Sequence, residues 1–554
     1  MGNVSEFTAA VDGGRLMGHC EEFAKRVKLS GTPEEKESFL YLQRCLQSYG
    51  YRAELLEHDA YISLPGASHV EVAGKRLTSI THSFSLPSPA GGLTAELVDL
   101  GDGAPQDFAG KDCRGRIVLV NGIASPAVAA RAKAAGASGQ LHVSPHEHLH
   151  EMCISPVWGN PSAETIGKMP ETVACTISLA DGEALRQQLA QSLGLKVTLH
   201  AEVDTGWRKT PLLVGEIDGP KGKDSPFVLL SGHHDTWYYG VMDNGSANAT
   251  MLEAARLLAA QSKTWRRGLR ICFWSGHSHG RYSGSAWYVD HHWRDLDRRC
   301  VAHVNVDSTG GIGATIMTEN GVVSSLVSLA VEATLAETGQ QHEGHRPSRS
   351  SDQSFWGIGI PSMYGSVSHQ PPSTVKMRNP LGWWWHTPHD LIDKIDRDFL
   401  IRDTRVVVHT LARLLTDMVL PIDPAAQLAS LAKELKTIGP TIPAELLTAV
   451  ETATAAVSRL KSSSVGDDGA AEKLNERLVR ICRLLVPLDY TEGDRFLHDP
   501  ALPQTPWPAL GALRAFAAAK PGSDEAKFAG VGASRAANRI LAALEAVEAL
   551  AVAQ

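Results

Sequence analysis

The sequence predicts an α/β fold with a mostly parallel sheet flanked by helices. Residues 227–230 form a continuous apolar run, which is typical of a strand that is buried on both faces of a parallel sheet. Residues 247–261 follow with the apolar spacing of a helix. Apolar runs at 269–274 and 301–306 also stop abruptly at polar residues. These polar residues are expected at the carboxyl edge of the sheet, where open α/β sheets bind ligands.

The N-terminal part predicts two helices between residues 17 and 51. A helix start is indicated in the middle of this segment, where Thr32 can cap the helix and Pro33 can occupy its first position. Two glutamates follow in the first turn, as is usual near the positive end of a helix dipole. A strand is expected from residue 50 onward.

The middle and the end of the chain have different textures. Between 66 and 206 we expect short strands and Gly-rich turns, with an Ala-rich helix at 127–135. The main sheet resumes at 212–217. After about residue 422 the pattern becomes helical, and the simplest interpretation is a packed helical domain without chemistry of its own. The expected helices cover 428–435, 444–460, 471–485 and 533–552.

Length and composition bound the class of protein. A chain of 554 residues exceeds the roughly 250–300 residues at which single cores stop growing, so two or three domains are expected. The net charge of −8 argues against nucleic acid or an anionic membrane as partner. No apolar stretch approaches the ~20 residues of a membrane span, and no secretory signal is evident. Eight cysteines without C-x-x-C pairs favour a cytoplasmic location.

Four separated segments end in residues that can bind metals. His233 and Asp235 form a His-x-Asp pair after the first apolar run, and Asp243 follows ten residues after His233. The later segments end at His277-Ser-His279, at Asp307 and at His386. Imidazole and carboxylate are the ligands that zinc and its neighbours accept, and a catalytic site leaves positions open for water and substrate. The first segment therefore indicates half of a two-metal site.

The order of these segments over residues 15–420 resembles the M28 metallopeptidases, which are zinc aminopeptidases and glutamate-carboxypeptidase-like enzymes with an inserted protease-associated domain. The resemblance implies one or two divalent ions per chain, most simply Zn²⁺, with Asp235 orienting the first imidazole. It also implies a zinc-peptidase-like catalytic domain from 1–65 and 207–422. A β-rich protease-associated insert would cover 66–206, and a C-terminal helical domain that could dimerise would cover 423–554. The metal ligands carried over directly are His233, Asp243, Asp307 and His386.

The chain departs from this family where a Glu-Glu pair is normal. Counting back from Gly284 and Ser285 puts His279 at the ligand glutamate and Ser278 at the general base. Counting forward from Trp274 puts His277 at the base and Ser278 at the ligand instead. We favour the first register because His279 can bind a metal, whereas serine is a poor zinc ligand. His277 is then the candidate that carries a proton to the leaving amine, since a free imidazole titrates near ~6.5.

Two further features are expected to line the pocket. Asp352 and Phe355 belong to a segment that resembles the S-D-x-x-F segment beside the metals of the family, although a plain loop-to-strand connection is equally compatible. Aromatic residues between and beside the predicted ligands suggest an apolar wall for the substrate, or simply packing. These aromatic residues are Trp237, Tyr238, Tyr239 and Trp385.

The pattern as a whole predicts a metal-dependent hydrolase of an amide or peptide bond that uses a metal-activated water. The substrate is expected to be a small molecule or a short peptide, by default one with a free N-terminus, and the chain is expected to form a homodimer. Loss of the Glu-Glu pair keeps two alternatives open. One is hydrolysis of a non-peptide amide or carbamate, and the other is a non-catalytic receptor or scaffold on the same fold.

Overall fold

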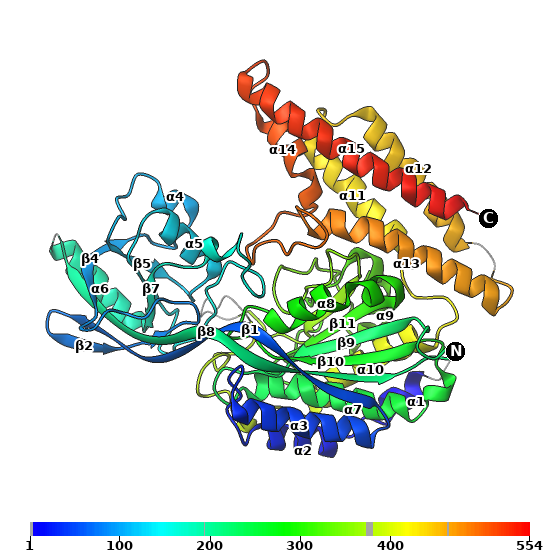
Figure 1. Cartoon of the computed structure of the whole chain (residues 1–554), viewed down its shortest axis with the longest axis horizontal. Helices are drawn as coiled ribbons and strands as arrows, with labels where there is room; N and C mark the ends of the chain where they lie inside the picture. Colours follow the sequence, from blue (N-terminus) through cyan, green and yellow to red (C-terminus); the bar gives the residue numbers. More distant parts are fainter. Residues whose placement is uncertain (1–3, 193, 373–379, 463–464, 554) are drawn as a thin grey trace.

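The computed structural model describes residues 4–192, 194–372, 380–462 and 465–553. Figure 1 shows a layered α/β body that contains the N-terminus, a lobe to one side built from residues between about 70 and 200, and a group of C-terminal helices above. Within the described residues no helix is long and apolar enough to cross a membrane.

The sheet of the α/β body is mixed and mostly parallel, as predicted. Strands β9 (Phe227–His233), β10 (Gly268–Trp274), β11 (Cys300–Asp307) and β12 (Ser362–Ser366) run parallel in the order β12-β11-β9-β10. Strand β8 (Lys196–Ile217) pairs antiparallel with β10. Because the four parallel strands point the same way, their last residues lie along one edge.

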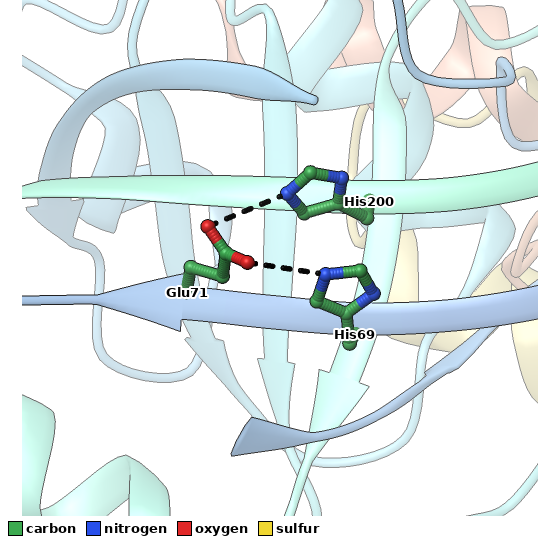
Figure 2. Close-up of side chains that lie close together, drawn as sticks. All are labelled: His69, Glu71 and His200. Carbon is green, nitrogen blue, oxygen red and sulfur yellow. Dashed lines mark ion pairs between the residues drawn. The ribbon is translucent and has the colours of Figure 1, made fainter. Parts of the chain in front are cut away.

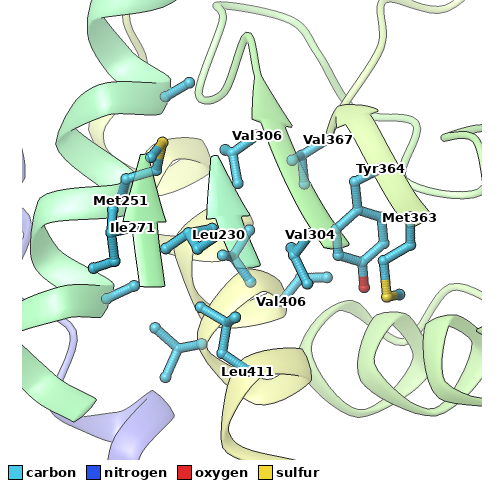
Figure 3. Close-up of a cluster of buried hydrophobic side chains, with 14 of the residues drawn as sticks. Leu230, Met251, Ile271, Val304, Val306, Met363, Tyr364, Val367, Val406 and Leu411 are labelled. Atoms are coloured by element: carbon cyan, nitrogen blue, oxygen red, sulfur yellow. The ribbon is translucent and has the colours of Figure 1, made fainter. Parts of the chain in front are cut away.

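Helices bury both faces of this sheet. Val228 and Leu230 of β9 belong to the larger core, shown in part in Figure 3, whereas Phe227 and Leu229 belong to a second core with Trp274. Side chains of a strand alternate between faces, so burial on both faces explains the uninterrupted apolar run in the sequence. The flanking helices are α2 (Gly13–Phe23), α3 (Pro33–Ser48), α7 (Ala247–Ala259), α8 (Ser283–Arg299), α9 (Val327–Thr338) and α10 (Arg397–Thr416).

The predicted start of α3 is confirmed. Pro33 is its first residue, and the Thr32 hydroxyl accepts a hydrogen bond from the Glu35 backbone N–H at 3.4 Å. The same helix also packs on the long strand β1 (Arg52–Val72), which pairs antiparallel with β8.

The side lobe is built on the far halves of β1 and β8. It contains β2 (Lys75–Thr78) and β3 (Ile80–Thr81), followed by the parallel strands β4 (Leu93–Asp99), β5 (Ile117–Asn121), β6 (Gly139–Val143) and β7 (Val173–Ile177). Helices α5 (Pro126–Ala134) and α6 (Leu179–Gln191) contact β6. The expected boundaries at 65/66 and 206/207 fall inside β1 and β8, so the ribbon is continuous from body to lobe. The division into domains therefore stays a prediction.

The C-terminal part is helical, as expected. It consists of α11 (Pro424–Ile438), α12 (Ala444–Ser462), α13 (Asp468–Tyr490), α14 (Gly511–Ala518) and α15 (Asp524–Val552), which share a core of their own. The chain between α13 and α14 returns to the α/β body, where residues 501–503 reach the wall of the main cleft.

Candidate metal centre

The predicted ligands meet at the carboxyl edge of the parallel strands. His233 is the last residue of β9 and Asp307 is the last residue of β11. Asp243 lies in the helical turn Val241–Ser246 that leads into α7, and His386 lies in a loop beyond β12. Sheet topology therefore brings together residues that are separated by more than 150 positions in the sequence.

Asp243 is the centre of the group. Its Oδ1 lies 3.2 Å from Nε2 of His233, and its Oδ2 lies 2.9 Å from Nε2 of His386. Asp307 adds a second carboxylate, with Oδ1 3.7 Å from Nε2 of His233. One carboxylate thus faces two imidazoles, one with each oxygen.

The turn that presents Asp243 depends on a glycine. Gly240 has a φ of +50°, and a Cβ atom there would lie 2.3 Å from the Asp243 carbonyl oxygen and 2.5 Å from Cβ of Thr236. Asp390 fixes the other side of the turn, since its carboxylate accepts hydrogen bonds from the backbone N–H groups of Met242 and Asp243 at 2.8 and 3.0 Å. Burial raises the pKa of Asp390 to about 7. Sequence reasoning did not assign this anchoring role, although Asp390 follows His386 closely.

Backbone carbonyls orient both imidazoles. Nδ1 of His233 lies 2.8 Å from the Asp235 carbonyl oxygen, and Nδ1 of His386 lies 2.7 Å from the Glu151 carbonyl oxygen. When each Nδ1–H donates to its carbonyl, Nε2 of each ring faces Asp243, where it can donate a proton to the carboxylate or, when deprotonated, share a cation with it. The expectation that the Asp235 carboxylate holds His233 is thereby modified, because the carbonyl of that residue makes the closer contact.

The Asp235 carboxylate holds the His-Ser-His loop instead. It accepts the backbone N–H groups of His277 and Ser278 at 3.2 and 2.8 Å, and the hydroxyl of Ser30 at 2.7 Å. Its side chain is fully buried. A remote element, the segment before α3, thus helps to set the position of this loop.

His277 reaches the group of ligands. Its ring stacks on that of His233 with centroids 3.7 Å apart, and His233, His277 and Asp307 form a cluster of potential metal-binding atoms within 4.8 Å of one another. Nδ1 of His277 lies 2.8 Å from Oδ2 of Asp352, whose other oxygen accepts from the Ser285 hydroxyl at 2.7 Å. This arrangement is that of a base held by a buried carboxylate.

His279, the preferred fifth ligand from the sequence, lies outside that cluster. Its Nδ1 accepts from the Ser30 backbone N–H at 3.4 Å and lies 3.0 Å from the Ser30 hydroxyl, and its ring packs against Trp237. Burial lowers the pKa of His279 to about 4, so the ring is neutral. Nε2 of this ring is buried without a hydrogen-bond partner among the described residues. The position of His277 beside His233 favours the forward register from Trp274, and the ligand role of His279 stays a prediction.

In the register counted forward from Trp274, Ser278 takes the place of the glutamate that binds a metal in the family. Its backbone is tied to Asp235, and its hydroxyl oxygen is buried without a hydrogen-bond partner among the described residues. The hydroxyl faces a cleft of about 520 Å³ that also exposes Asp243, Asp307 and His386. A neutral hydroxyl is a weaker ligand than a carboxylate.

Residues of the α/β body, the side lobe and the C-terminal part all line the cleft. Met152 and Cys153 come from the lobe, residues 501–503 come from the C-terminal part, and the metal-facing residues come from the body. Arg281 also lines the cleft, and its Nε is buried without a partner within the part of the chain that the structure describes.

Only some of the pocket residues expected from the sequence line the cleft. Trp237 and Trp385 line the cleft, and Trp385 stacks on His386 with ring centroids 3.5 Å apart. Phe355 is buried in the core beside Trp274. The remaining expected residues do not line the cleft, since Asp352 is buried behind His277 while Tyr238 and Tyr239 lie outside the lining residues.

The charges of the buried imidazoles and carboxylates indicate which ligand this cluster can bind. Burial opposes the charged form of His233, but Asp243 and Asp307 outweigh it and raise the pKa of His233 well above its usual value. Burial would raise the pKa of Asp243, yet His233 and His386 lower it below its usual range. The buried carboxylates therefore require positive charge between them, which divalent ions supply as well as protonated imidazoles do.

A set of imidazole and carboxylate ligands at the carboxyl edge of a mostly parallel sheet defines an α/β protein of the zinc-peptidase fold class. Residues 213–411 match the model of peptidase family M28. The predicted resemblance is confirmed.

Curated relatives point the same way. The chain is 27% identical over 397 residues to the aminopeptidase YwaD of Bacillus subtilis, covering 67% of this chain and 78% of that protein. It is 24% identical over 352 residues to the probable glutamate carboxypeptidase VP8 of Zea mays, covering 51% of this chain and 49% of that protein. The chain thus spans about half the length of the Zea mays relative.

Solved structures agree on the fold. A zinc aminopeptidase from Bacillus subtilis superposes with a TM-score of 0.57 at 22% identity, covering 74% of this chain and 96% of that one. An aminopeptidase from Aneurinibacillus sp. strain AM-1 gives the same TM-score of 0.57 at 20% identity and the same coverage of 74% and 96%.

Proposed function

We propose that this chain is a divalent-metal-dependent hydrolase of amide or peptide bonds, acting on a short peptide or small molecule. Asp243 carries the proposal, because its two oxygens face His233 and His386 at 3.2 and 2.9 Å. A carboxylate flanked in this way is suited to bridge two metal ions. The aminopeptidase relatives support a peptide with a free N-terminus as the default substrate.

The residues present fit such ions. Nε2 of His233 and Oδ1 of Asp243 are buried, close together and without hydrogen-bond partners among the described residues, as expected of atoms prepared for a shared cation. His233, Asp243 and Asp307 would hold one ion, and Asp243 with His386 would hold the other. Zn²⁺ suits this nitrogen and oxygen donor set. The second ion is expected to bind more weakly, because Ser278 stands where a carboxylate would complete its ligands.

The side chains around the ions divide the remaining work. When bound, the ions polarise the scissile carbonyl and lower the pKa of water to near ~7. His277, oriented by Asp352, takes a proton from the attacking water and delivers it to the leaving nitrogen. Trp237 and Trp385 restrict water in the cleft and hold an apolar group of the substrate. The catalytic set is therefore His277 with its positioning residue Asp352, while Asp235 keeps the loop in place.

The test combines metal content with turnover. The purified chain should contain one or two transition-metal ions and hydrolyse members of a panel of aminoacyl-anilides. Asp243→Asn should lose both properties, whereas Asp398→Asn, a change at a surface carboxylate whose side chain is 88% exposed, should lose neither. A chain that binds no transition metal when offered an excess would contradict the proposal and favour the scaffold alternative.

A non-peptide amide or carbamate is the second candidate substrate. The observation that favours it is the replacement of two carboxylates by His277 and Ser278. A different base and a different metal ligand would suit a substrate with a different leaving group. Metal binding without turnover of any aminoacyl-anilide, together with hydrolysis of an N-acyl or N-carbamoyl panel, would select this candidate.

The proposal includes a cytoplasmic homodimer. All eight cysteines are free thiols, which supports a reducing compartment. The C-terminal helix α15 carries the exposed side chains Phe528 and Val531, with relative exposures of 78% and 53%, which supports an interface there. Light scattering should give the mass of two chains, and the double change Phe528→Ser and Val531→Ser should give the mass of one. A wild-type chain that is monomeric at high concentration would refute this part.

A further inference from the structure

We propose a second metal site, far from the cleft, formed by His69, Glu71 and His200 on the β1–β8 ribbon. These three residues form a cluster whose potential ligand atoms all lie within 4.8 Å of one another. Figure 2 shows both rings and the carboxylate meeting on one face of the two strands. The site would take a transition-metal ion of borderline softness such as Zn²⁺, and it does not depend on the proposed hydrolase activity.

Strand pairing creates the cluster. His69 on β1 is the direct cross-strand partner of His200 on β8, so both side chains project from the same face of the ribbon. Glu71 lies two residues after His69 and therefore on that face as well. The two rings stack with centroids 4.0 Å apart and planes within 6°.

The distances favour a shared ion over simple pairing. Nε2 of His69 lies 3.4 Å from one oxygen of Glu71, and Nε2 of His200 lies 3.7 Å from the other. Both distances exceed the usual length of a hydrogen bond, and Nε2 of His200 is buried without a hydrogen-bond partner among the described residues. A zinc ion with bonds of about 2.0–2.2 Å to nitrogen and oxygen would satisfy all three atoms after a small contraction.

The side chains have the freedom that this contraction requires. The side chains of His69, His200 and Glu71 are 19%, 23% and 49% exposed, so the rings can rotate out of their parallel stack toward one ion. The backbone beneath them is held more firmly. Strand β4 pairs with β8 beside the site, and a Cβ at Gly92 would lie 2.7 Å from Cε1 of His200. Two histidines and one carboxylate leave a coordination position open, as in zinc sites that bind water or a ligand.

The surroundings supply a hollow on one side of the cluster and one opposing charge. A depression of about 570 Å³ is lined by His69, His200, Arg76 and Glu202, among others. Arg76 on β2 is the direct partner of Glu71 in the strand register, so its positive charge opposes a bound cation. Because the ion would bind residues of both long strands, it would cross-link β1 and β8 within the side lobe.

Zinc binding to the full chain tests the site. After removal of metals by a chelator, equilibrium dialysis against Zn²⁺ should give one more ion per chain for the wild type than for His69→Gln or His200→Gln. The matched control is His345→Gln, which removes an exposed imidazole that pairs with Glu343 at 3.0 Å but has no second histidine in that pair. This control should bind as many ions as the wild type, and Arg76→Gln should bind the additional ion more tightly.

Equal zinc content in the wild type, His69→Gln and His200→Gln would contradict the proposed metal site. The cluster would then be only a carboxylate that pairs with two imidazoles. Thermal melting in chelator should coincide for these chains, which shows that the variants fold. Hydrolysis by His200→Gln should equal that of the wild type, so loss of this ion is distinguishable from failure at the catalytic centre.

Discussion

Replacing Asp352 by Asn tests whether His277 moves the proton in the reaction. The change keeps the size of the side chain but replaces a carboxylate oxygen that faces Nδ1 of His277 at 2.8 Å. With the carboxylate, Nδ1–H donates and Nε2 is free to accept a proton from the cleft. The amide can present its NH₂ group to Nδ1 instead, which stabilises the tautomer with the proton on Nε2.

The expected loss follows from the role of the imidazole. A positioned acid–base group contributes about 10²–10⁴-fold to a rate, which corresponds to roughly 3–5 kcal/mol of barrier. Asp352 is fully buried and its second oxygen is held by Ser285, so water cannot substitute for it easily. We therefore expect Asp352→Asn to lower kcat by about 10²–10⁴-fold while KM changes little.

The assay must separate proton transfer from metal loss. Steady-state rates on the best aminoacyl-anilide should be measured beside metal content, because His277 also lies near the potential ligands. The matched control is Asp290→Asn, since Asp290 pairs with His498 at 3.0 Å on the surface, away from the cleft. A full rate with full metal content in Asp352→Asn would refute the proton-carrying role. Loss of metal in parallel with the rate would instead make His277 a ligand.

Three further predictions address the metal loop, its turn and the stability of the chain. His279→Ala should keep its metal content by elemental analysis, because that ring lies outside the cluster of potential ligands; a lost ion would restore the register counted back from Gly284 and Ser285. Gly240→Ala should lose metal affinity, whereas Gly222→Ala, which has a similar φ of +61° and open space around its Cβ, should keep it. Burial lowers the pKa of His58 to about 4, so the unfolded chain binds this proton more readily below its usual ~6.5 and stability falls as the pH drops. Between pH 7.5 and 5 the wild type should lose about 2 kcal/mol more stability than His58→Gln in urea unfolding, and equal losses would contradict the assignment.

The strands and the place of the first candidate ligand were predictable because burial leaves a local signature in the sequence. Residues 227–230 are apolar without interruption since the two faces of β9 enter different cores. Once that strand is recognised, His233 must stand at its carboxyl end. The start of α3 was readable for the same reason, because Thr32 and Pro33 act on the next few residues only.

The lobe was less predictable because its limits are not local. Composition changes near 66 and 206, yet β1 and β8 pass through both positions as single strands. Antiparallel pairing between these two strands, which are far apart in the sequence, keeps the ribbon continuous.

 The structure gives the register of the pairs, from Arg52 with Glu216 to Glu71 with Thr198. No pattern within either segment reveals that these partners lie opposite one another.

The His-Ser-His loop shows most clearly why spacing alone could not settle the site. Counting back from Gly284 and Ser285 assumes that the loop has the length usual in the family. Arg281 and Tyr282 instead adopt left-handed backbone conformations, with φ of +50° and +71°, immediately before α8 begins. A count of residues along the sequence does not register such a turn, so the two counts remained alternatives until the loop was seen in the fold.

The position of His277 then depends on contacts that the sequence does not display. Asp235 holds the backbone of the loop, Asp352 holds the ring, and Ser30 occupies Nδ1 of His279. These three partners come from different elements, so only the folded chain shows that the ring of His277 lies beside His233 and Asp307. If the proposed second ion binds at Asp243 and His386, we expect its affinity to be the property most easily lost, because Ser278 adds no charge to these two side chains.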